Sequence, residues 1–217
     1  MTQRCVFVTG ATGYVGRALI ARLVQRGHRV RALARAASVP LLPPGTSAVA
    51  GDALDAASYA DAIAPADTLV HLVGTPHPNP RKARQFLDVD LASIREACAA
   101  ARHARVAHLV YVSVAQPAPV MQAYIGTRRE GEALVLATDI DSTVVRPWYI
   151  IGPGHRWPLL LTPLYALFER IPATRDSARR LGLVSLAQMV AALLFAIEHR
   201  PSGVRVVDVP GIRGCAP

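Results

Sequence analysis

Lysine is almost absent from this 217-residue sequence. Lys82 is the single instance, and arginine supplies the rest of the 24 basic residues, which together with 15 acidic residues give a formal charge of +9. Such an excess favours an anionic partner. The arginines are scattered from Arg4 to Arg213 without a run of five or six, and no zinc spacing or RNA-stacking motif accompanies them. We therefore expect a small phosphate-bearing partner and no nucleic acid.

Cysteine is also scarce, and long hydrophobic runs are missing. Cys5, Cys98 and Cys215 are too far apart for metal-ligand or CxxC spacing, which indicates a reducing compartment, no disulfide framework and no metal site. The most apolar stretches, PLLLTPLYALF and VSLAQMVAALLFAI, fall short of the ~20 residues that a membrane span needs. No signal-peptide pattern precedes the first predicted strand. The sequence predicts a soluble, cytoplasmic protein without a membrane span.

Segments typical of strands and helices alternate along the chain. The predicted strands are CVFVT, RVRALA, SAVAG, DTLVHLV, AHLVYVSV, STVVRP and VRVVDV. Helices are predicted between them, among them GRALIARLVQRG, residues 81–104 and residues 122–137. This alternation predicts an α/β fold with a doubly wound parallel sheet, the Rossmann fold. We expect one domain over residues 1–217, in which residues 154–203 form a short helical cap on the substrate side.

The most specific motif is TGATGYVG, residues 9–16, between the first predicted strand and the first helix. Gly10 allows a tight turn, Gly13 lets backbone amides approach a pyrophosphate, and Gly16 lets the helix pack closely on the strand. The amino end of the helix adds N–H groups and about half a positive charge. A glycine-rich turn without a ligand is the alternative, but the strand-to-helix context favours a dinucleotide.

The residue after the second strand indicates which dinucleotide is bound. A carboxylate about 20 residues after the glycines would bind the ribose 2′-hydroxyl of NAD. No acid lies between Gly16 and Asp52, and the second strand ends in Arg35. A guanidinium can bind a 2′-phosphate in a bidentate manner. NADP(H) is therefore predicted in preference to NAD(H). The alternative is that Arg35 is one of many surface arginines.

Six motifs occur in an order that resembles a known superfamily. TGATGYVG, GDALD, HLVG, YVSV, the pair Tyr124/Arg128 and RPWYIIGPG are together similar to the extended and atypical short-chain dehydrogenases/reductases, especially their NmrA-like, NAD(P)-binding branch. The resemblance covers residues 3–154 well and the remainder loosely. It implies a Rossmann fold and an oxidoreductase.

The resemblance also implies a cofactor site made of several segments. Asp52 matches an acid at the adenine edge, Val73–Thr75 match the segment under the adenine ribose, and the loop after the sixth strand matches the nicotinamide side. The implied catalytic residues are Tyr124, Arg128 in the place of a lysine, and Ser113. The predicted cofactor-binding residues are Gly10, Thr12, Gly13, Tyr14, Val15, Gly16, Arg35, Asp52, Ala53, Val73, Gly74, Thr75, Ser113, Arg128, Pro147, Trp148, Tyr149 and Ile150.

The chain departs from the family's pattern at three positions. Arg128 replaces the lysine, and Asp90 stands where many relatives have an asparagine. Ala115 matches the catalytic serine or threonine at least as well as Ser113 does, so the carbonyl-orienting role falls to Ser113, to Gln116 or to neither.

The pair Tyr124/Arg128 has two interpretations. Spacing of i, i+4 places both side chains on one helix face, where the arginine can supply a positive field but cannot relay a proton. The alternative is a solvated helix face that comprises Arg128, Arg129, Glu130 and Glu132. His71, within the fourth predicted strand, is expected to be a buried and hydrogen-bonded histidine.

Two functions remain open, with a weaker third. An NADP(H)-dependent reductase of a small apolar carbonyl, enone or quinone would use Tyr124 as its acid. A non-catalytic NADP(H)-binding redox sensor or assembly factor would instead have a cofactor-dependent protein partner. An epimerase or dehydratase needs more room for a sugar nucleotide than a short cap leaves. We expect a monomer or homodimer.

Overall fold

The computed structural model describes residues 3–154 and 180–215. Within these ranges, seven parallel strands form one sheet in the order β3-β2-β1-β4-β5-β6-β9, and all seven were predicted. This order reverses between β1 and β4, as in doubly wound folds, so the predicted fold class is confirmed. The strands are β1 (Cys5–Thr9), β2 (Arg29–Ala34), β3 (Ser47–Ala50), β4 (Thr68–His71), β5 (His108–Val112), β6 (Asp141–Val145) and β9 (Val204–Val207).

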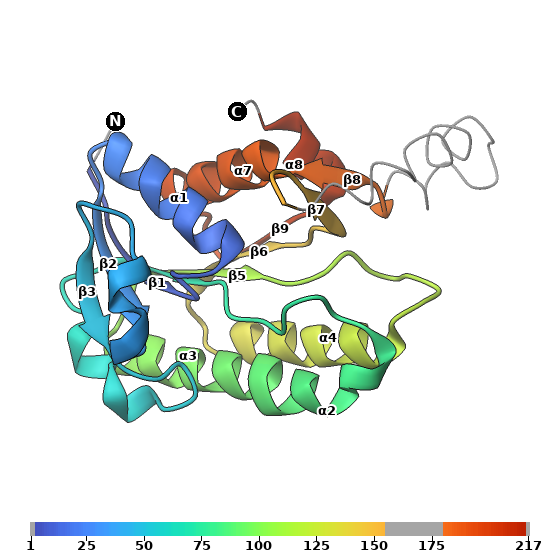
Figure 1. Ribbon diagram of the computed structural model, residues 1–217, viewed down its shortest axis with the longest axis horizontal. Coiled ribbons are helices and arrows are strands. Elements are labelled where there is room, and N and C mark those ends of the chain that lie inside the picture. The colour runs from blue at the N-terminus through green and yellow to red at the C-terminus, as the bar shows by residue number, and fades with distance from the viewer. Residues whose placement is uncertain (1–2, 155–179, 216–217) are drawn as a thin grey trace.

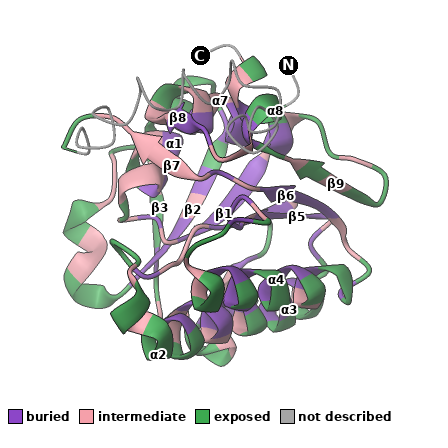
Figure 2. Cartoon of the chain, turned by 90° about the vertical axis from the view of Figure 1, so that its right-hand side faces the viewer, coloured by how far each residue is buried: buried purple, intermediate pink, exposed green. Residues whose placement is uncertain are grey.

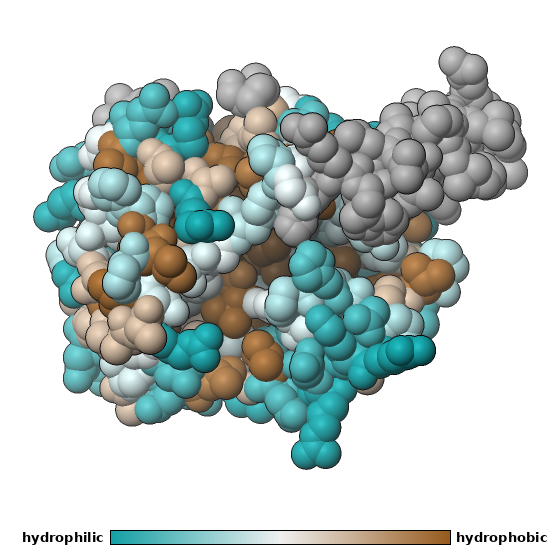
Figure 3. Space-filling view, viewed as in Figure 1, coloured by the Kyte–Doolittle hydropathy of each residue, from teal (hydrophilic) through white to brown (hydrophobic). Residues whose placement is uncertain are grey.

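Helices cover both faces of the sheet (Figure 1). Helices α1 (Tyr14–Gln25) and α7 (Leu186–Glu198) lie side by side on one face, and α3 (Ala92–His103) and α4 (Gln122–Leu136) lie on the other. A large cluster of buried apolar side chains fills the space on each side. The inner strands are buried, whereas the edge strand β9 is partly exposed (Figure 2). Between the two helical layers the surface is hollowed and hydrophobic (Figure 3).

Helix α1 shows how the apolar pattern becomes packing. Leu19, Ile20 and Leu23 are completely buried, at the helical spacing that the sequence predicted. Each contributes about 1.5–3 kcal/mol by leaving water. The helix ends at Gln25, and Gly27 then adopts φ +80°, a left-handed conformation that glycine reaches without a steric penalty.

The predicted helix over residues 81–104 is present but is built of four pieces. A 3₁₀ turn (Pro80–Lys82) and the short α2 (Ala83–Gln85) precede a π-helical segment, η5 (Phe86–Leu91), and then α3 begins. A π-helix is rare, and it often occurs at functional sites. In this segment it buries Phe86, Asp90 and Leu91 against the rest of the domain. The sequence carried no signal for it.

Some elements differ from the sequence-based predictions. A two-stranded parallel sheet of β7 (Tyr149–Ile151) and β8 (Leu183–Ser185) was missed, as was α8 (Val209–Gly214), because such short segments carry little periodicity. The stretch AASYADAIA, residues 56–64, whose composition also predicts a small helix, forms two 3₁₀ turns instead. Half of the predicted cap, residues 155–179, lies outside the described residues, and so does its apolar stretch PLLLTPLYALF. No helix within the described ranges is long and apolar enough to cross a membrane.

Two glycines of α4 have opposite surroundings. A Cβ at Gly126 would meet no described atom within 4 Å, whereas one at Gly131 would lie 2.5 Å from the hydroxyl oxygen of Tyr111 and 3.1 Å from Cγ2 of Ile94. We expect Gly126→Ala to raise the free energy of unfolding by about 0.5–1 kcal/mol, because alanine favours a helix. Gly131→Ala should lower it by about 1–3 kcal/mol through overpacking. Urea denaturation measures both, and equal effects would contradict the close packing of α3 on α4.

Candidate cofactor and active site

The turn after β1 contains the glycines of the TGATGYVG motif. Gly10 has φ +71°, and a Cβ there would lie 2.7 Å from the carbonyl carbon of Leu72, just beyond β4. A Cβ at Gly16 would overlap the carbonyl oxygen of Gly10, so glycine is what permits α1 to pack so closely on the turn. Gly13 is the N-cap of α1, and no side chain caps the helix. The amino end of α1 can therefore receive an anion such as a pyrophosphate.

A cavity of about 320 Å³ adjoins the glycine turn. It lies at the carboxyl ends of the parallel strands, where doubly wound sheets bind their ligands. Leu33 and Val89 give it an apolar wall, and Ser38 a hydroxyl. Six of the predicted cofactor-binding residues line it: Gly10, Thr12, Arg35, Asp52, Ala53 and Val73. The structure thus brings together residues from four separate segments, as the sequence predicted.

Arg35 is the exposed cation of this cavity. It directly follows β2, and within residues 3–154 and 180–215 its guanidinium has no hydrogen-bond or ion-pair partner. The backbone N–H of Ser38 donates to the carbonyl of Arg35 at 2.7 Å, in a 3₁₀ turn (Ala36–Leu41) that brings Ser38 to the same cavity. A guanidinium and a hydroxyl at one rim can bind a phosphate group.

The pair Tyr124/Arg128 is formed as predicted. Nε of Arg128 donates to the hydroxyl oxygen of Tyr124 at 3.2 Å, and the guanidinium carbon lies 5.2 Å from the centre of the tyrosine ring. The ring of Phe86, from the π-helical segment, packs against Tyr124 with centroids 4.9 Å apart. Arg128 is only 5% exposed. Burial alone would lower its pKa, but Tyr124, Tyr111 and Asp90 raise the pKa of Arg128 above its ordinary value, so it remains a cation.

Asp90 is the counter-ion of Arg128. Its Oδ1 lies 2.6 Å from Nη2 of Arg128, and Asp90 is 1% exposed. The other oxygen, Oδ2, accepts hydrogen bonds from the backbone N–H and the hydroxyl of Thr75, at 3.0 and 2.6 Å. Gly74 lies directly against the guanidinium, because a Cβ there would overlap Nη2. Nη1 donates to the carbonyl of Val112 at 3.1 Å. The ion pair therefore connects the ends of β4 and β5 to α4.

Ser113 follows β5 and is 3% exposed. Its backbone N–H donates to the carbonyl of Val145 at 2.8 Å, while its hydroxyl has no hydrogen-bond partner among the described residues. A buried hydroxyl without a partner is destabilising, which suits a group that binds a ligand oxygen. Ala115, the other match to the catalytic serine, offers only its backbone, whose N–H donates to the carbonyl of Pro147 at 2.9 Å.

The loop after β6 contributes aromatic side chains. Trp148 and Tyr124 pack against one small cluster, formed by Val114, Ala118 and Ile125. Two other predicted residues, Tyr149 and Ile150, belong to β7 and pair with β8. The structure thus places Trp148 in the same small cluster as Tyr124.

The side chains of two motif residues of α1 make contacts within the protein. The hydroxyl of Tyr14 occupies the space of a Cβ at Gly152, at the end of β7. Val15 packs into the core below α1.

A network around Glu132 was not predicted. Glu132 is buried, and its two oxygens accept from Nε and Nη2 of Arg146 at 2.9 and 2.5 Å and from Nε2 of Gln116 at 2.9 Å. Oε1 of Gln116 accepts from Arg129 at 3.1 Å. Gln116 is therefore engaged at both ends, which leaves Ser113 as the better group to orient a carbonyl. No local pattern marks contacts between residues so far apart in the sequence.

The helix face around Arg128 is divided. Arg128 and Glu132 are buried and each has an ionic partner, whereas Arg129 and Glu130 are exposed. The alternative of one continuous solvated face therefore fails for the two inward residues and holds for the two outward ones.

His71 is buried and hydrogen-bonded, as predicted. Its Nδ1 lies 2.8 Å from the hydroxyl of Thr9, and its Nε2 lies 3.2 Å from the hydroxyl of Ser93. Burial, with a smaller contribution from Arg128, lowers the pKa of His71 to about 3. It is therefore a neutral structural residue and no base. Burial and then Arg205 lower the pKa of His108 to about 4 in the same way.

We expect these histidines to make the fold acid-sensitive. An unfolded histidine titrates near pH 6.5, so as pH falls from about 6.5 towards 3 the unfolded chain binds protons that the folded chain does not. The free energy of unfolding should fall by about 1.4 kcal/mol per pH unit for each such group within its window. His71→Gln should reduce the slope between pH 6 and 4 by about that amount in urea titrations. If the free energy of unfolding of His71→Gln changed with pH as steeply as that of the wild type, groups other than His71 would cause the acid sensitivity.

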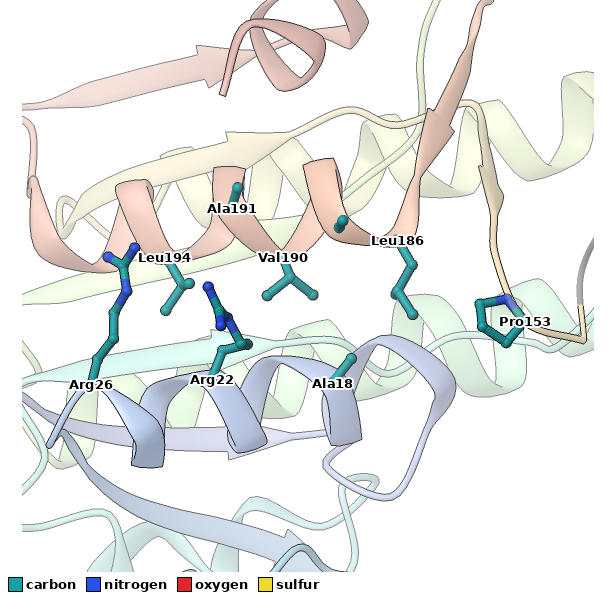
Figure 4. Close-up of a pocket in the computed structure, with 9 residues that line it drawn as sticks. Ala18, Arg22, Arg26, Pro153, Leu186, Val190, Ala191 and Leu194 are labelled. Atoms are coloured by element: carbon teal, nitrogen blue, oxygen red, sulfur yellow. The ribbon is translucent and has the colours of Figure 1, made fainter. Parts of the chain in front are cut away.

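A different cavity, of about 460 Å³, lies between α1 and α7 (Figure 4). Ala18 and Arg22 of α1 face Val190 and Leu194 of α7 across it. It is larger than the cavity beside the glycine turn, yet none of the predicted site residues lines it. Volume alone therefore does not locate a cofactor here, and the glycine turn is the better guide.

The fold and this geometry define a class of protein. The reversal of strand order between β1 and β4, the glycine turn at the start of α1 and the position of Tyr124 after β5 are those of a dinucleotide-binding short-chain dehydrogenase/reductase, in which Arg128 takes the place of the family's lysine. Residues 10–155 match the family described as NAD(P)H-binding, and the chain belongs to that family.

Two relatives of known name are a reductase and a ketoreductase. The chain is 33% identical over 179 residues to the ceramide reductase of Caulobacter vibrioides (strain NA1000 / CB15N), across 80% of this chain and 55% of that protein. It is 30% identical over 224 residues to the 4-hydroxy-2-methyl-3-oxo-4-farnesyl-3,4-dihydroquinoline-1-oxide ketoreductase of Stigmatella aurantiaca, across 91% of this chain and 65% of that protein. The chain thus spans less than two thirds of the length of these relatives.

Solved structures share the fold. MoeE5 in complex with UDP-glucose and NAD superimposes with a TM-score of 0.69 and 22% identity, over 95% of this chain and 79% of that chain. A UDP-galactose 4-epimerase gives a TM-score of 0.72 and 18% identity, over 94% and 76%. At such identities the likeness establishes the fold alone. The predicted superfamily is confirmed, while the NmrA-like branch and the preference for NADP(H) stay predictions.

Proposed function

We propose that this protein is an NADP(H)-dependent reductase that acts on a carbonyl carried by an apolar molecule. One observation carries the proposal: the hydroxyl of Tyr124 lies 3.2 Å from Nε of a buried arginine, on the sheet edge that also holds the cavity beside the glycine turn. The names of the two relatives, one for ceramide and one for a farnesyl-bearing quinoline oxide, support an apolar substrate with a long hydrocarbon chain.

The residues around the glycine turn and Tyr124 fit a nicotinamide dinucleotide. Amides at the start of α1 would bind the pyrophosphate, and Asp52 and Ala53 would lie at the adenine. Val73 would contact the ribose, and Arg35 with Ser38 would bind the 2′-phosphate. On the nicotinamide side, we place the loop from Pro147 to Ile150, because Trp148 shares a cluster with Tyr124.

The chain's own residues would then manage the proton and the carbonyl. The bound cofactor supplies the hydride that adds to the carbonyl carbon. As the carbonyl oxygen gains negative charge, Tyr124 would transfer its hydroxyl proton to that oxygen, so that an alcohol forms. Ser113 would donate a hydrogen bond to the same oxygen and orient it. Water afterwards returns a proton to Tyr124.

A substrate screen tests this reductase function. We expect NADPH to be oxidised with long-chain ketones, enones or quinones, and kcat/KM to be higher for a long-chain ketone than for its short-chain analogue with the same carbonyl. Reaction mixtures without the protein provide the blank. NADPH oxidation that never exceeds this blank, with any carbonyl in the panel, would refute a reductase.

A second function, a non-catalytic NADP(H) sensor, is favoured by one observation. Asp90 offsets the positive charge that Arg128 would otherwise place beside Tyr124. A sensor would bind NADPH tightly without turnover and would retain a protein partner in the presence of NADPH but not NADP⁺. A pull-down performed with each cofactor form distinguishes the two functions, because a reductase needs no such partner.

A further inference from the structure

Two of the three positions at which this chain departs from its family contact each other. Asp90 and Arg128 are far apart in the sequence, yet their side chains form one ion pair with an N–O distance of 2.6 Å. We propose that Asp90 is a positioning residue for Tyr124, which holds the guanidinium of Arg128 in place and cancels its charge beside the tyrosine hydroxyl. The proposal deepens the proposed reductase function and rests on it.

Each partner of the ion pair has further contacts that orient it. Oδ2 of Asp90 is fixed by both the N–H and the hydroxyl of Thr75, so Oδ1 is held towards Arg128. Arg128 is then fixed by Asp90 at Nη2 and by the carbonyl of Val112 at Nη1, which leaves Nε directed at Tyr124. The π-helical segment that contains Asp90 also supplies the ring that packs on Tyr124. The π-helical segment, a rare backbone geometry, therefore supplies both the Phe86 ring that packs on Tyr124 and the Asp90 carboxylate that pairs with Arg128.

The charges around the tyrosine are few within the part of the chain that the structure describes. Besides Tyr124 itself, the ionisable groups gathered here are Arg128 on α4, Asp90 on the π-helical segment, Tyr111 on β5 and His71 on β4. Burial keeps Tyr111 and His71 uncharged, since it raises the pKa of Tyr111 and lowers that of His71. One positive and one negative charge remain, so removing either one leaves a net field at Tyr124.

The test changes each charge alone and then both together. The variants are Asp90→Asn, Arg128→Gln and the double variant Asp90→Asn/Arg128→Gln, and the readout is the pH profile of kcat for carbonyl reduction. A lone cation favours the ionised tyrosine, so Asp90→Asn should move the limb of the profile that reports Tyr124 to lower pH by about one to two units. Arg128→Gln should move the same limb to higher pH. The double variant, which is neutral like the wild type, should return it to within about 0.5 unit of the wild-type position.

Two further measurements, steady-state kinetics and urea denaturation, distinguish a positioning role of Asp90 from a general loss of structure. Asp90→Asn should lower kcat by about 10-fold or more, because Arg128 and with it Tyr124 would be less well positioned. The KM for NADPH should stay within about 3-fold of the wild-type value, because Asp90 does not line the cavity beside the glycine turn. Asp90→Glu keeps the charge and should leave the pH profile in place. In urea, each single variant should lower the midpoint by more than the double variant does, because a single substitution leaves one buried charge unpaired.

The outcomes decide the proposal even where a variant is unstable. If Asp90→Asn does not fold, the opposite shift in Arg128→Gln and its reversal in the double variant carry the same information. A pH limb that stays in place in both folded single variants, or urea effects that simply add in the double variant, would overturn the proposal. A wild-type protein without reductase activity would refute the proposed function and with it the role for Tyr124, while the urea cycle would still decide whether the pair is coupled.

Discussion

Replacing Arg35 with alanine should weaken NADPH binding by about 10- to 150-fold and leave NADH binding nearly unchanged. A hydrogen bond to a charged group contributes about 1.5–3 kcal/mol, which corresponds to this range of dissociation constants. Arg35 has no partner within the described residues, so its guanidinium need not abandon a protein contact to bind the 2′-phosphate. Calorimetric titration of both cofactors against wild type and variant measures the effect.

Arg29 provides the matched control for that substitution. It is exposed at the opposite end of the same strand, so Arg29→Ala removes the same charge without touching the cavity. Its NADPH affinity should stay within about 2-fold of wild type, because charges beyond a Debye length are largely screened. An equal loss in both variants would mean that net charge matters and that Arg35 does not select the nucleotide.

Replacing Tyr124 with phenylalanine should reduce kcat for carbonyl reduction by about 100- to 10,000-fold, the usual contribution of a positioned acid. Only the hydroxyl is removed, and the ring keeps its packing against Phe86. The dissociation constant for NADPH should therefore remain within about 3-fold of wild type. Steady-state kinetics with saturating substrate, together with cofactor titration, measure both quantities.

Tyr59 is the control for this second substitution. It is as large and more deeply buried, it stacks on Phe7, and its hydroxyl has no hydrogen-bond partner in the described ranges. Tyr59→Phe should leave kcat unchanged. If Tyr124→Phe retained the wild-type rate, another group would be the acid, and Ser113 would be the first candidate to examine.

The fold was largely predictable because its signals are local. The spacing of Leu19, Ile20 and Leu23 predicts α1. The buried strands are likewise predicted, because they are short apolar runs bounded by turns. The glycine turn was predictable for the same reason, since Gly10 and Gly16 are constrained by neighbours a few positions away. The cavity beside it follows from the parallel sheet, which brings the carboxyl ends of its strands to one edge.

The surroundings of Tyr124 could be predicted only in part, because their contacts are long-range. Spacing of i, i+4 was enough to join Tyr124 to Arg128. Nothing in the sequence indicates that Asp90 approaches the same arginine, because a π-helical turn directs it there and such turns leave no periodic pattern. The bonds between Glu132 and Arg146 likewise cross from α4 to the end of β6.

A crystal structure of the protein grown with saturating NADPH is the most direct test of where and how the cofactor is held. We predict that the pyrophosphate oxygens accept hydrogen bonds from backbone amides between Gly10 and Gly16, with the adenosine in the cavity that Asp52 lines and the 2′-phosphate against Arg35. NADPH bound instead in the cavity between α1 and α7, or no bound NADPH while the glycine turn is accessible, would contradict this assignment.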